Sequence, residues 1–240
     1  MIEIIIINWC SSSLTSPPPR HHPGKSGGIR NFPMENVLTA YPPPKRYPRE
    51  GVGRFLGFYK PPPDQRRRGP SDSAAVVVIW GKDPKYYTAQ VLKLLAHLSS
   101  LPSVTLHSTV SSSLAGLPSS VVTHGHLQES EWMALLHGAT HVLGLGDPLL
   151  GPTGLDAIYS GCVLINPSYK KPKRGWMSQQ GYIEEYVDER YSCTVNLADF
   201  EAVEVCIKEK RVDAGHVPKE YMKNEYRQRV NDIFGPFLGG

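Results

Sequence analysis

The chain has 240 residues, of which 40% are hydrophobic and 20% are charged, and its formal net charge is +4. This length allows one large domain or two small ones, and the hydrophobic fraction is sufficient for a core. The mild charge argues against a chain dedicated to nucleic acid. We expect no targeting or transmembrane segment, because no run approaches the roughly 20 apolar residues that span a membrane and Ile4–Ile7 is too short for a signal peptide.

Prolines concentrate in the first part of the chain, including PPP triplets at 17–19, 42–44 and 61–63. Such a segment buries little apolar surface and offers few backbone donors, so we expect residues 1–37 to be extended or disordered. Residues 38–72 contain the apolar stretch Val52–Tyr59. We expect this linker to pack onto the domain that follows.

Alternating elements begin at residue 73 and predict an α/β domain over residues 73–240. Ala74–Trp80 is a continuous apolar run, typical of a strand buried on both faces. Further strands are expected at 104–107, 120–123, 142–145, 162–165 and 192–195. Helices are expected at 85–98, 129–137, 153–161, 182–187, 199–210 and 218–234. This alternation predicts a Rossmann-like parallel sheet with helices on both faces.

The stretch 142–167 reads as a strand, a glycine-rich turn, a helix and a second strand. The turn at Gly151–Thr153 stands at a helix N-terminus, where free backbone N–H groups favour an anion such as phosphate. Asp156 falls in the first turn of this helix, where its carboxylate could accept hydrogen bonds from ribose hydroxyls. The alternative is that the glycines only permit a tight turn and that Asp156 offsets the helix dipole.

Three more polar residues follow predicted strands, at the edge where ligands bind in such sheets. Lys82 could neutralise a diphosphate, or it is a solvated loop lysine. His124 could stack on or hydrogen-bond a base or phosphate, or it is structural. Asn166 ends the strand after the Asp156 helix, although Asn-Pro also opens turns. His126 lacks a third ligand nearby, so we expect no metal site.

The strongest basic run is Lys170–Arg174 (KKPKR), which is similar to a nuclear-import signal or a nucleic-acid patch. A solvated loop is the favoured interpretation. The four cysteines, Cys10, Cys162, Cys193 and Cys206, show no C-x-x-C spacing, so a zinc site is not expected. Their pairing stays open.

Several motifs, in the same order, resemble the C-terminal half of glycosyltransferase family 18, the alpha-1,6-mannosylglycoprotein 6-beta-N-acetylglucosaminyltransferases. They are FLGF at 55–58, Trp80-Gly81-Lys82, His124-Gly125, GPTGLDAIYSGCVLINP at 151–167, Ser178-Gln179 with Tyr182, and Thr194–Leu197. The Ser178 motif is similar to the family's Ser-Gln-His-Pro-Tyr. The likeness spreads over residues 38–240.

The resemblance implies a GT-B fold, of which this chain would contain the second, donor-binding domain. It implies inverting, metal-independent transfer of GlcNAc from UDP-GlcNAc to the 6-hydroxyl of a mannose in an N-glycan. The partners would be UDP-GlcNAc and an N-glycan or glycoprotein acceptor, with no cofactor and no nucleic acid, in the Golgi lumen. It adds Pro152, Ser178 and Gln179 to the expected donor-binding residues, beside Lys82 and Asp156.

Two positions depart from the family, which has glutamate where Leu150 and Asp156 stand. An inverting transferase also needs a general base, and in the family this carboxylate belongs to an N-terminal domain that we expect outside this sequence. No catalytic residue is therefore assigned. One alternative is a catalytically inactive UDP-sugar-binding fragment. Another is a basic nuclear or RNA-associated protein, which the near-neutral composition disfavours.

Overall fold

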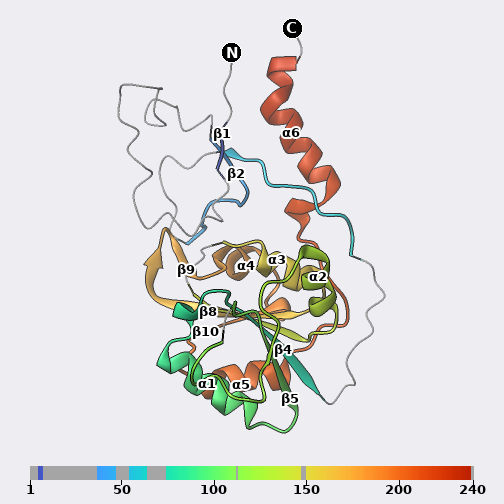
Figure 1. The fold of residues 1–240 in the computed structure, drawn as a ribbon. Helices are drawn as coiled ribbons and strands as arrows, with labels where there is room; N and C mark the ends of the chain where they lie inside the picture. Colours follow the sequence, from blue (N-terminus) through green and yellow to red (C-terminus); the bar gives the residue numbers. More distant parts are fainter. Residues whose placement is uncertain are drawn as a thin grey trace, which may run out of the picture.

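The computed structural model describes residues 5–7, 37–46, 54–63, 74–111, 113–146 and 150–238. These residues form an α/β domain, and helix α6 with a small three-stranded sheet extends from it (Figure 1). The expected disorder of residues 1–37 lies mostly outside the described residues, but Ile5–Ile7 forms a short strand. The predicted domain boundaries stay a prediction.

The large sheet contains β4 (Ala75–Trp80), β5 (Val104–Ser108), β6 (Val122–Thr123), β7 (His141–Gly144), β8 (Val163–Lys173), β9 (Trp176–Ser178) and β10 (Ser192–Val195). The small sheet contains β1 (Ile5–Ile7), β2 (Val37–Thr39) and β3 (Arg54–Phe55). The predicted strands of the α/β domain are confirmed, with ends that differ by a few residues apart from β8 and β9.

The helices are α1 (Ala89–Ser99), α2 (Glu129–His137), α3 (Thr153–Tyr159), α4 (Gly181–Tyr186), α5 (Phe200–Glu209) and α6 (Lys223–Leu238), with 3-10 turns at Pro84–Tyr86, Glu189–Tyr191 and Lys219–Tyr221. Side chains fix two of the helix starts. Thr88 accepts from the Val91 amide at 3.4 Å, and Asp199 accepts from the Ala202 amide at 3.0 Å. Helix α1 therefore begins later than the predicted residue 85.

The strands of the large sheet pair in the order β10-β8-β7-β4-β5-β6, and all pairs along this path are parallel. Numbered by their sequence among these six, this order is the Rossmann order, in which the direction of winding reverses between the first and fourth strands. Here the reversal lies between β4 and β7. The prediction of a Rossmann-like parallel sheet is confirmed.

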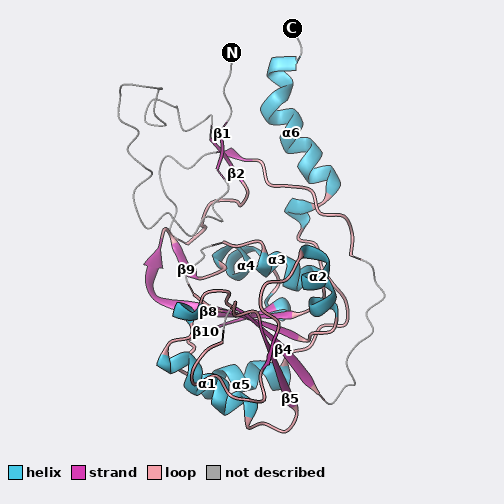
Figure 2. Ribbon diagram, viewed as in Figure 1, coloured by secondary structure: helices cyan, strands magenta, loops and turns pink. Residues whose placement is uncertain are grey.

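Helices cover both faces of this sheet (Figure 2). Residues of β4 alternate between the faces, so Val77 and Ile79 pack in one core and Val78 in the other. The first core also receives α1 and α5, and the second receives α2, α3 and α4. The two-sided burial explains the continuous apolar run of β4.

The basic run 170–174 is not the predicted solvated loop. Strand β8 continues through Lys173 and turns back antiparallel into β9, with Lys173 paired to Trp176. Arg174 and Gly175 have φ of 50° and 85°, the left-handed pair that a two-residue hairpin turn requires. The lysines are exposed on this hairpin, which projects beyond the sheet (Figure 1).

Helix α6 packs against the small sheet through a separate apolar cluster of Leu38, Leu56 and Ile233. The Arg229 guanidinium lies over the Phe55 ring and its Nε donates to the Leu56 carbonyl at 2.8 Å. Closer to the large sheet, the Lys60 amide donates to the Tyr221 carbonyl at 2.9 Å. The segment 54–63 therefore runs from α6 back to the α/β domain.

A disulfide joins Cys193 on the edge strand β10 to Cys206 on α5. Cys162 is a buried thiol outside this disulfide, and its Sγ donates to the Leu136 carbonyl at 3.3 Å. Among the residues that the structure describes, no helix is long and apolar enough to cross a membrane.

Candidate functional site

The reversal between β4 and β7 creates the crevice where ligands bind in open parallel sheets, outside the carboxyl ends of the strands. Trp80 at the end of β4 pairs with Gly144 at the end of β7, and the Leu145 amide donates to the Trp80 carbonyl at 2.9 Å. The residues that follow these two strands therefore start side by side. They include Gly81 and Lys82 on one side and Gly146 on the other.

Lys82 is exposed at this edge, while its backbone is fixed. The Lys82 carbonyl accepts from the Ser111 amide at 3.0 Å, and the Gly81 amide donates to the Thr109 hydroxyl at 3.2 Å. A Cβ at Gly81 would lie 3.0 Å from Leu145 Cβ, so glycine lets the two chain segments approach. Lys82 thus presents a positive charge at this edge from a backbone that hydrogen bonds hold in place.

The start of α3 lies next to the same crevice. A Cβ at Gly151 would lie 3.3 Å from the Trp80 ring, so the residue preceding Pro152 and Thr153 packs on the end of β4. The Gly151 amide has a partner within the chain. In the orientation of the Gln180 amide that satisfies both groups, the Gln180 oxygen accepts from the Gly151 N–H at 3.2 Å. The open donors are the first-turn amides that helix geometry leaves without carbonyl partners, starting at Thr153.

Asp156 has a charged partner that the sequence reasoning missed. The Lys60 ammonium lies 2.8 Å from Asp156 Oδ1, and 4.5 Å from the centre of the Tyr159 ring. The two side chains of the ion pair are 18% and 23% exposed, so the pair is sheltered from water without being sealed from it. Contact of Asp156 with a ribose stays a prediction, and nothing in the sequence pointed to Lys60.

The other family glutamate position, Leu150, is 5% exposed and belongs to the core that α3 and α4 share. Its φ is 59°, which is unusual for a residue with a branched side chain. The side chain at this position is thus directed into apolar surroundings, which suits leucine better than a carboxylate.

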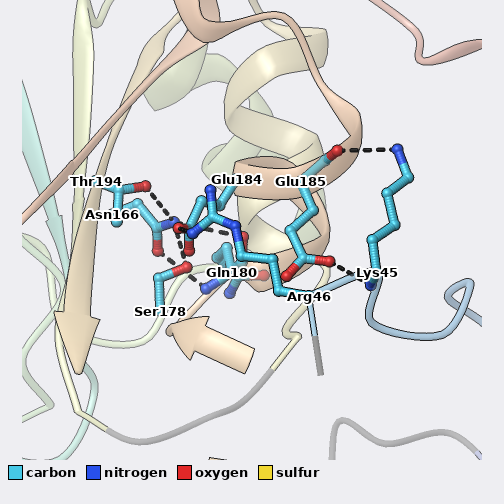
Figure 3. A network of polar contacts seen from close by, with 8 residues as sticks. All are labelled: Lys45, Arg46, Asn166, Ser178, Gln180, Glu184, Glu185 and Thr194. Atoms are coloured by element: carbon cyan, nitrogen blue, oxygen red, sulfur yellow. Dashed lines mark hydrogen bonds and ion pairs between the residues drawn. The ribbon is translucent and has the colours of Figure 1, made fainter. Parts of the chain in front are cut away.

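Asn166, Ser178 and Gln179 are buried, with exposed fractions of 0%, 0% and 1%. Asn166 Nδ2 donates to the Ser178 hydroxyl at 2.9 Å and to the Thr194 hydroxyl at 3.2 Å. Figure 3 shows Asn166, Ser178 and Thr194 converging with Gln180 from β8, β9, β10 and the start of α4. They lie beneath the site and link its elements, and a direct contact of Asn166, Ser178 or Gln179 with a donor stays a prediction.

His124 lies after β6, at the outer end of the same edge. Its Nε2 is 2.8 Å from Nδ1 of His107 on β5, with the two rings inclined by 17°. Burial and the neighbouring His124 lower the pKa of His107. The sequence reasoning did not single out His107, although its place near the end of a predicted strand was a usable signal.

Outside this edge, an ion pair and a backbone hydrogen bond tie the segment 41–46 to α4. The Arg46 guanidinium pairs with the Glu184 carboxylate, and the Lys45 amide donates to Glu185 Oε2 at 2.6 Å (Figure 3). Among the described residues, no group of three or more His, Cys, Asp or Glu side chains is arranged to hold a metal ion.

The fold and these edge residues define a doubly wound α/β domain with a polar site at its switch point. The family model of glycosyltransferase family 18 matches residues 45–235, and the chain belongs to this family. Family membership and strand order together confirm the predicted fold class, a Rossmann-like domain of a GT-B glycosyltransferase.

Among curated relatives, the human alpha-1,6-mannosylglycoprotein 6-beta-N-acetylglucosaminyltransferase A is 31% identical over 52% of this chain and 19% of its own length. The Caenorhabditis elegans alpha-1,6-mannosylglycoprotein 6-beta-N-acetylglucosaminyltransferase is 31% identical over 68% of this chain and 26% of its own. The chain spans about a quarter or less of the curated relatives it matches. A solved Thermobaculum terrenum O-GlcNAc transferase mutant aligns with a TM-score of 0.47 and 12% identity over 82% of this chain and 41% of its own, which carries no argument by itself.

Proposed function

We propose that this domain binds UDP-GlcNAc as the donor half of a transferase that adds β-1,6 GlcNAc to mannose of N-glycans. The observation that carries the proposal is the convergence of Lys82 and the start of α3 at the β4/β7 switch point. An ammonium and a helix N-terminus that border the same crevice suit a diphosphate. The names of the relatives supply the sugar and the acceptor.

The proposed chemistry needs stabilisation of the departing UDP, whose negative charge grows as the glycosidic bond breaks. Lys82 and the first-turn amides of α3 would supply positive potential there without a divalent cation. Inversion and metal independence rest on the family resemblance. The general base is expected in the part of the relatives that this chain does not match.

The family's setting implies the Golgi lumen, and the Cys193–Cys206 disulfide supports an oxidising compartment. The partners of the proposed activity are UDP-GlcNAc and an N-glycan or glycoprotein acceptor. The exposed lysines of the β8–β9 hairpin are not assigned to nucleic acid.

The test is calorimetric titration of UDP and UDP-GlcNAc into the whole chain. Replacing Lys82 removes a charge-assisted contact worth about 1.5–3 kcal/mol, so Lys82→Ala should weaken binding about tenfold to a hundredfold. Lys93→Ala, which removes an exposed lysine of α1, is the matched control and should bind like the wild type. Absence of UDP binding by the folded wild type, or equal losses in both variants, would overturn the proposal.

The second candidate is an inactive UDP-sugar-binding fragment, and the Lys60–Asp156 ion pair together with the buried Leu150 favours it. The release of free UDP from UDP-GlcNAc, in the presence of an N-glycan acceptor, separates the two candidates. Binding with turnover supports the transferase. Binding without turnover supports the inactive protein when the assayed chain also contains the region of the relatives that the present sequence does not match.

A further inference from the structure

Two consecutive glutamines form hydrogen bonds with the backbone on both sides of the turn between β7 and α3. Gln179 and Gln180 follow β9, and they are only 1% and 2% exposed. Burying an amide is costly unless hydrogen bonds compensate, and here Gln179 Nε2 and both ends of the Gln180 amide have partners, whereas Gln179 Oε1 has none among the described residues. The partners of these two side chains are backbone groups of the proposed donor site.

Gln179 holds the side of the turn that leaves β7 and also reaches the returning side. Its Nε2 donates to the Leu145 carbonyl at 3.0 Å and to the Gly146 carbonyl at 3.2 Å. The backbone carbonyl of Gln179 accepts from the Leu150 amide at 3.0 Å. A Cβ at Gly144 would lie 2.0 Å from Gln179 Oε1, so the side chain fits only because this strand ends in glycine.

Gln180 holds the start of α3. In the satisfied orientation its amide nitrogen donates to the Gly151 carbonyl at 3.1 Å, and its oxygen accepts from the Gly151 amide at 3.2 Å. This two-point pairing fixes the orientation of the backbone at Gly151, as a neighbouring β-strand would. A Cβ at Gly154 would lie 3.0 Å from Gln180 Cγ, so the glutamine also packs against the first turn of the helix.

The backbone of Gln180 is itself anchored to the sheet. The backbone N–H of Gln180 donates to Asn166 Oδ1 at 2.9 Å, and Asn166 Nδ2 donates to the backbone carbonyl of Gln180 at 3.4 Å. Asn166 stands on β8 and is bonded to Thr194 of β10. Hydrogen bonds thus link Thr194 on the edge strand through Asn166 to the backbone of Gln180 (Figure 3), and the Gln180 side chain reaches Gly151.

We propose that Gln180, assisted by Gln179, is a positioning residue that sets the first turn of α3 for the donor diphosphate. The inference rests on the proposed function and adds to it the residue that holds the site in place. In the family motif that this chain resembles, histidine stands at the position of Gln180. An imidazole cannot pair with both the N–H and the carbonyl of one residue as a side-chain amide does. The two-point pairing with Gly151 is therefore a feature of the present chain.

The test compares Gln180→Met with a matched control, Thr140→Val. Methionine has similar length and makes neither bond to Gly151. Thr140 is also buried, and its hydroxyl also pairs with both backbone groups of one residue, Val76, at 3.0 Å each. It lies at the opposite, amino end of the same sheet, so its loss should lower stability without reaching the site.

For each variant we would measure the melting temperature, the hydrogen exchange of the Gly151 amide by NMR, and UDP affinity by calorimetry. Misplacement of binding groups by about 1 Å is costly, so Gln180→Met should weaken UDP binding about tenfold or more. It should also speed exchange at Gly151 at least about tenfold. Thr140→Val should lower the melting temperature with both site measurements unchanged.

Unchanged Gly151 exchange or UDP affinity in Gln180→Met would overturn the inference, as would an equal loss of affinity in Thr140→Val. If Gln180→Met fails to fold, Gln180→Glu, which keeps the acceptor and loses the donor, replaces it with the same criteria. Failure of the wild type to bind UDP would overturn the proposed function and this role with it. The Gly151 exchange would then still tell whether the glutamine holds the turn.

Discussion

Lys60 and His107 illustrate how single residues acquire roles through partners that are distant in sequence. Lys60 pairs with Asp156 across 96 positions, and His107 bonds His124 across 17. Each partner had been identified from its place after a strand or in a helix turn. The residue on the other side could not be identified in this way, because only the tertiary fold brings it near.

His107 leads to a prediction about pH. Burial and His124 hold the pKa of His107 below its ordinary value of 6.5, so the unfolded chain binds a proton more readily than the folded one. Stability from this residue is therefore complete above about pH 6.5 and declines as the pH falls below that value. The measurement is the urea midpoint between pH 5 and pH 8.

His107→Phe removes the group that titrates and should make the acid side of this curve flatter. The ring keeps its apolar contacts but loses the hydrogen bond to His124, which shifts the whole curve, so the slope of the curve and not its height reports protonation. A curve with the same slope in the variant would show that other groups carry the acid sensitivity. One such group is His216, whose pKa is also lowered by burial.

At the scale of elements, the β8–β9 hairpin is the largest error of the sequence reasoning. The Lys170–Arg174 run has no apolar alternation, so it indicated a loop, whereas the structure extends the strand to Lys173. The available signal was Gly175 between Arg174 and Trp176, a position where a two-residue turn needs glycine. Strand pairing overrode local propensity here.

Gly175→Ala tests this turn. Gly175 has φ of 85°, which an alanine adopts only at a cost, so the variant should lose about 1 kcal/mol of unfolding free energy. Gly138→Ala is the control, because Gly138 has φ of −87° and the nearest atom to its Cβ position is 3.6 Å away. Equal stability of the two variants by urea denaturation would contradict the strained turn.

Most other elements of the α/β domain were predictable, since their signals are local. Helix α2 has the predicted bounds 129–137, and α5 follows its N-cap Asp199, the first residue of the predicted helix 199–210. The candidate site was predictable only in part. Lys82 and Thr153 stand at the expected edge, but the roles of Asn166 and Gln179 depend on burial, which no pattern in the sequence reveals.

At the scale of the whole molecule, the disulfide is the main covalent constraint among the described residues. It closes a loop between Cys193 and Cys206, 13 positions apart, and fastens α5 to the edge strand. Loops of this size contribute about 2–4 kcal/mol through the unfolded state. We expect the melting temperature to fall by several degrees in reducing agent.

The double variant Cys193→Ser/Cys206→Ser supplies the control. It should melt at the temperature of the reduced wild type and should not respond to reducing agent, because no other disulfide joins described residues. A further decrease on reduction would assign the effect to another bond.

The strand order also has a consequence for synthesis on the ribosome. Strand β4 emerges early, yet it becomes the centre of the sheet only when β7 has been made and has inserted beside it. Until then its apolar run has only the neighbours on the β5 side, and one edge remains open to other chains. The protein therefore depends during translation on whatever protects that edge, and nascent chains halted before β7 should aggregate.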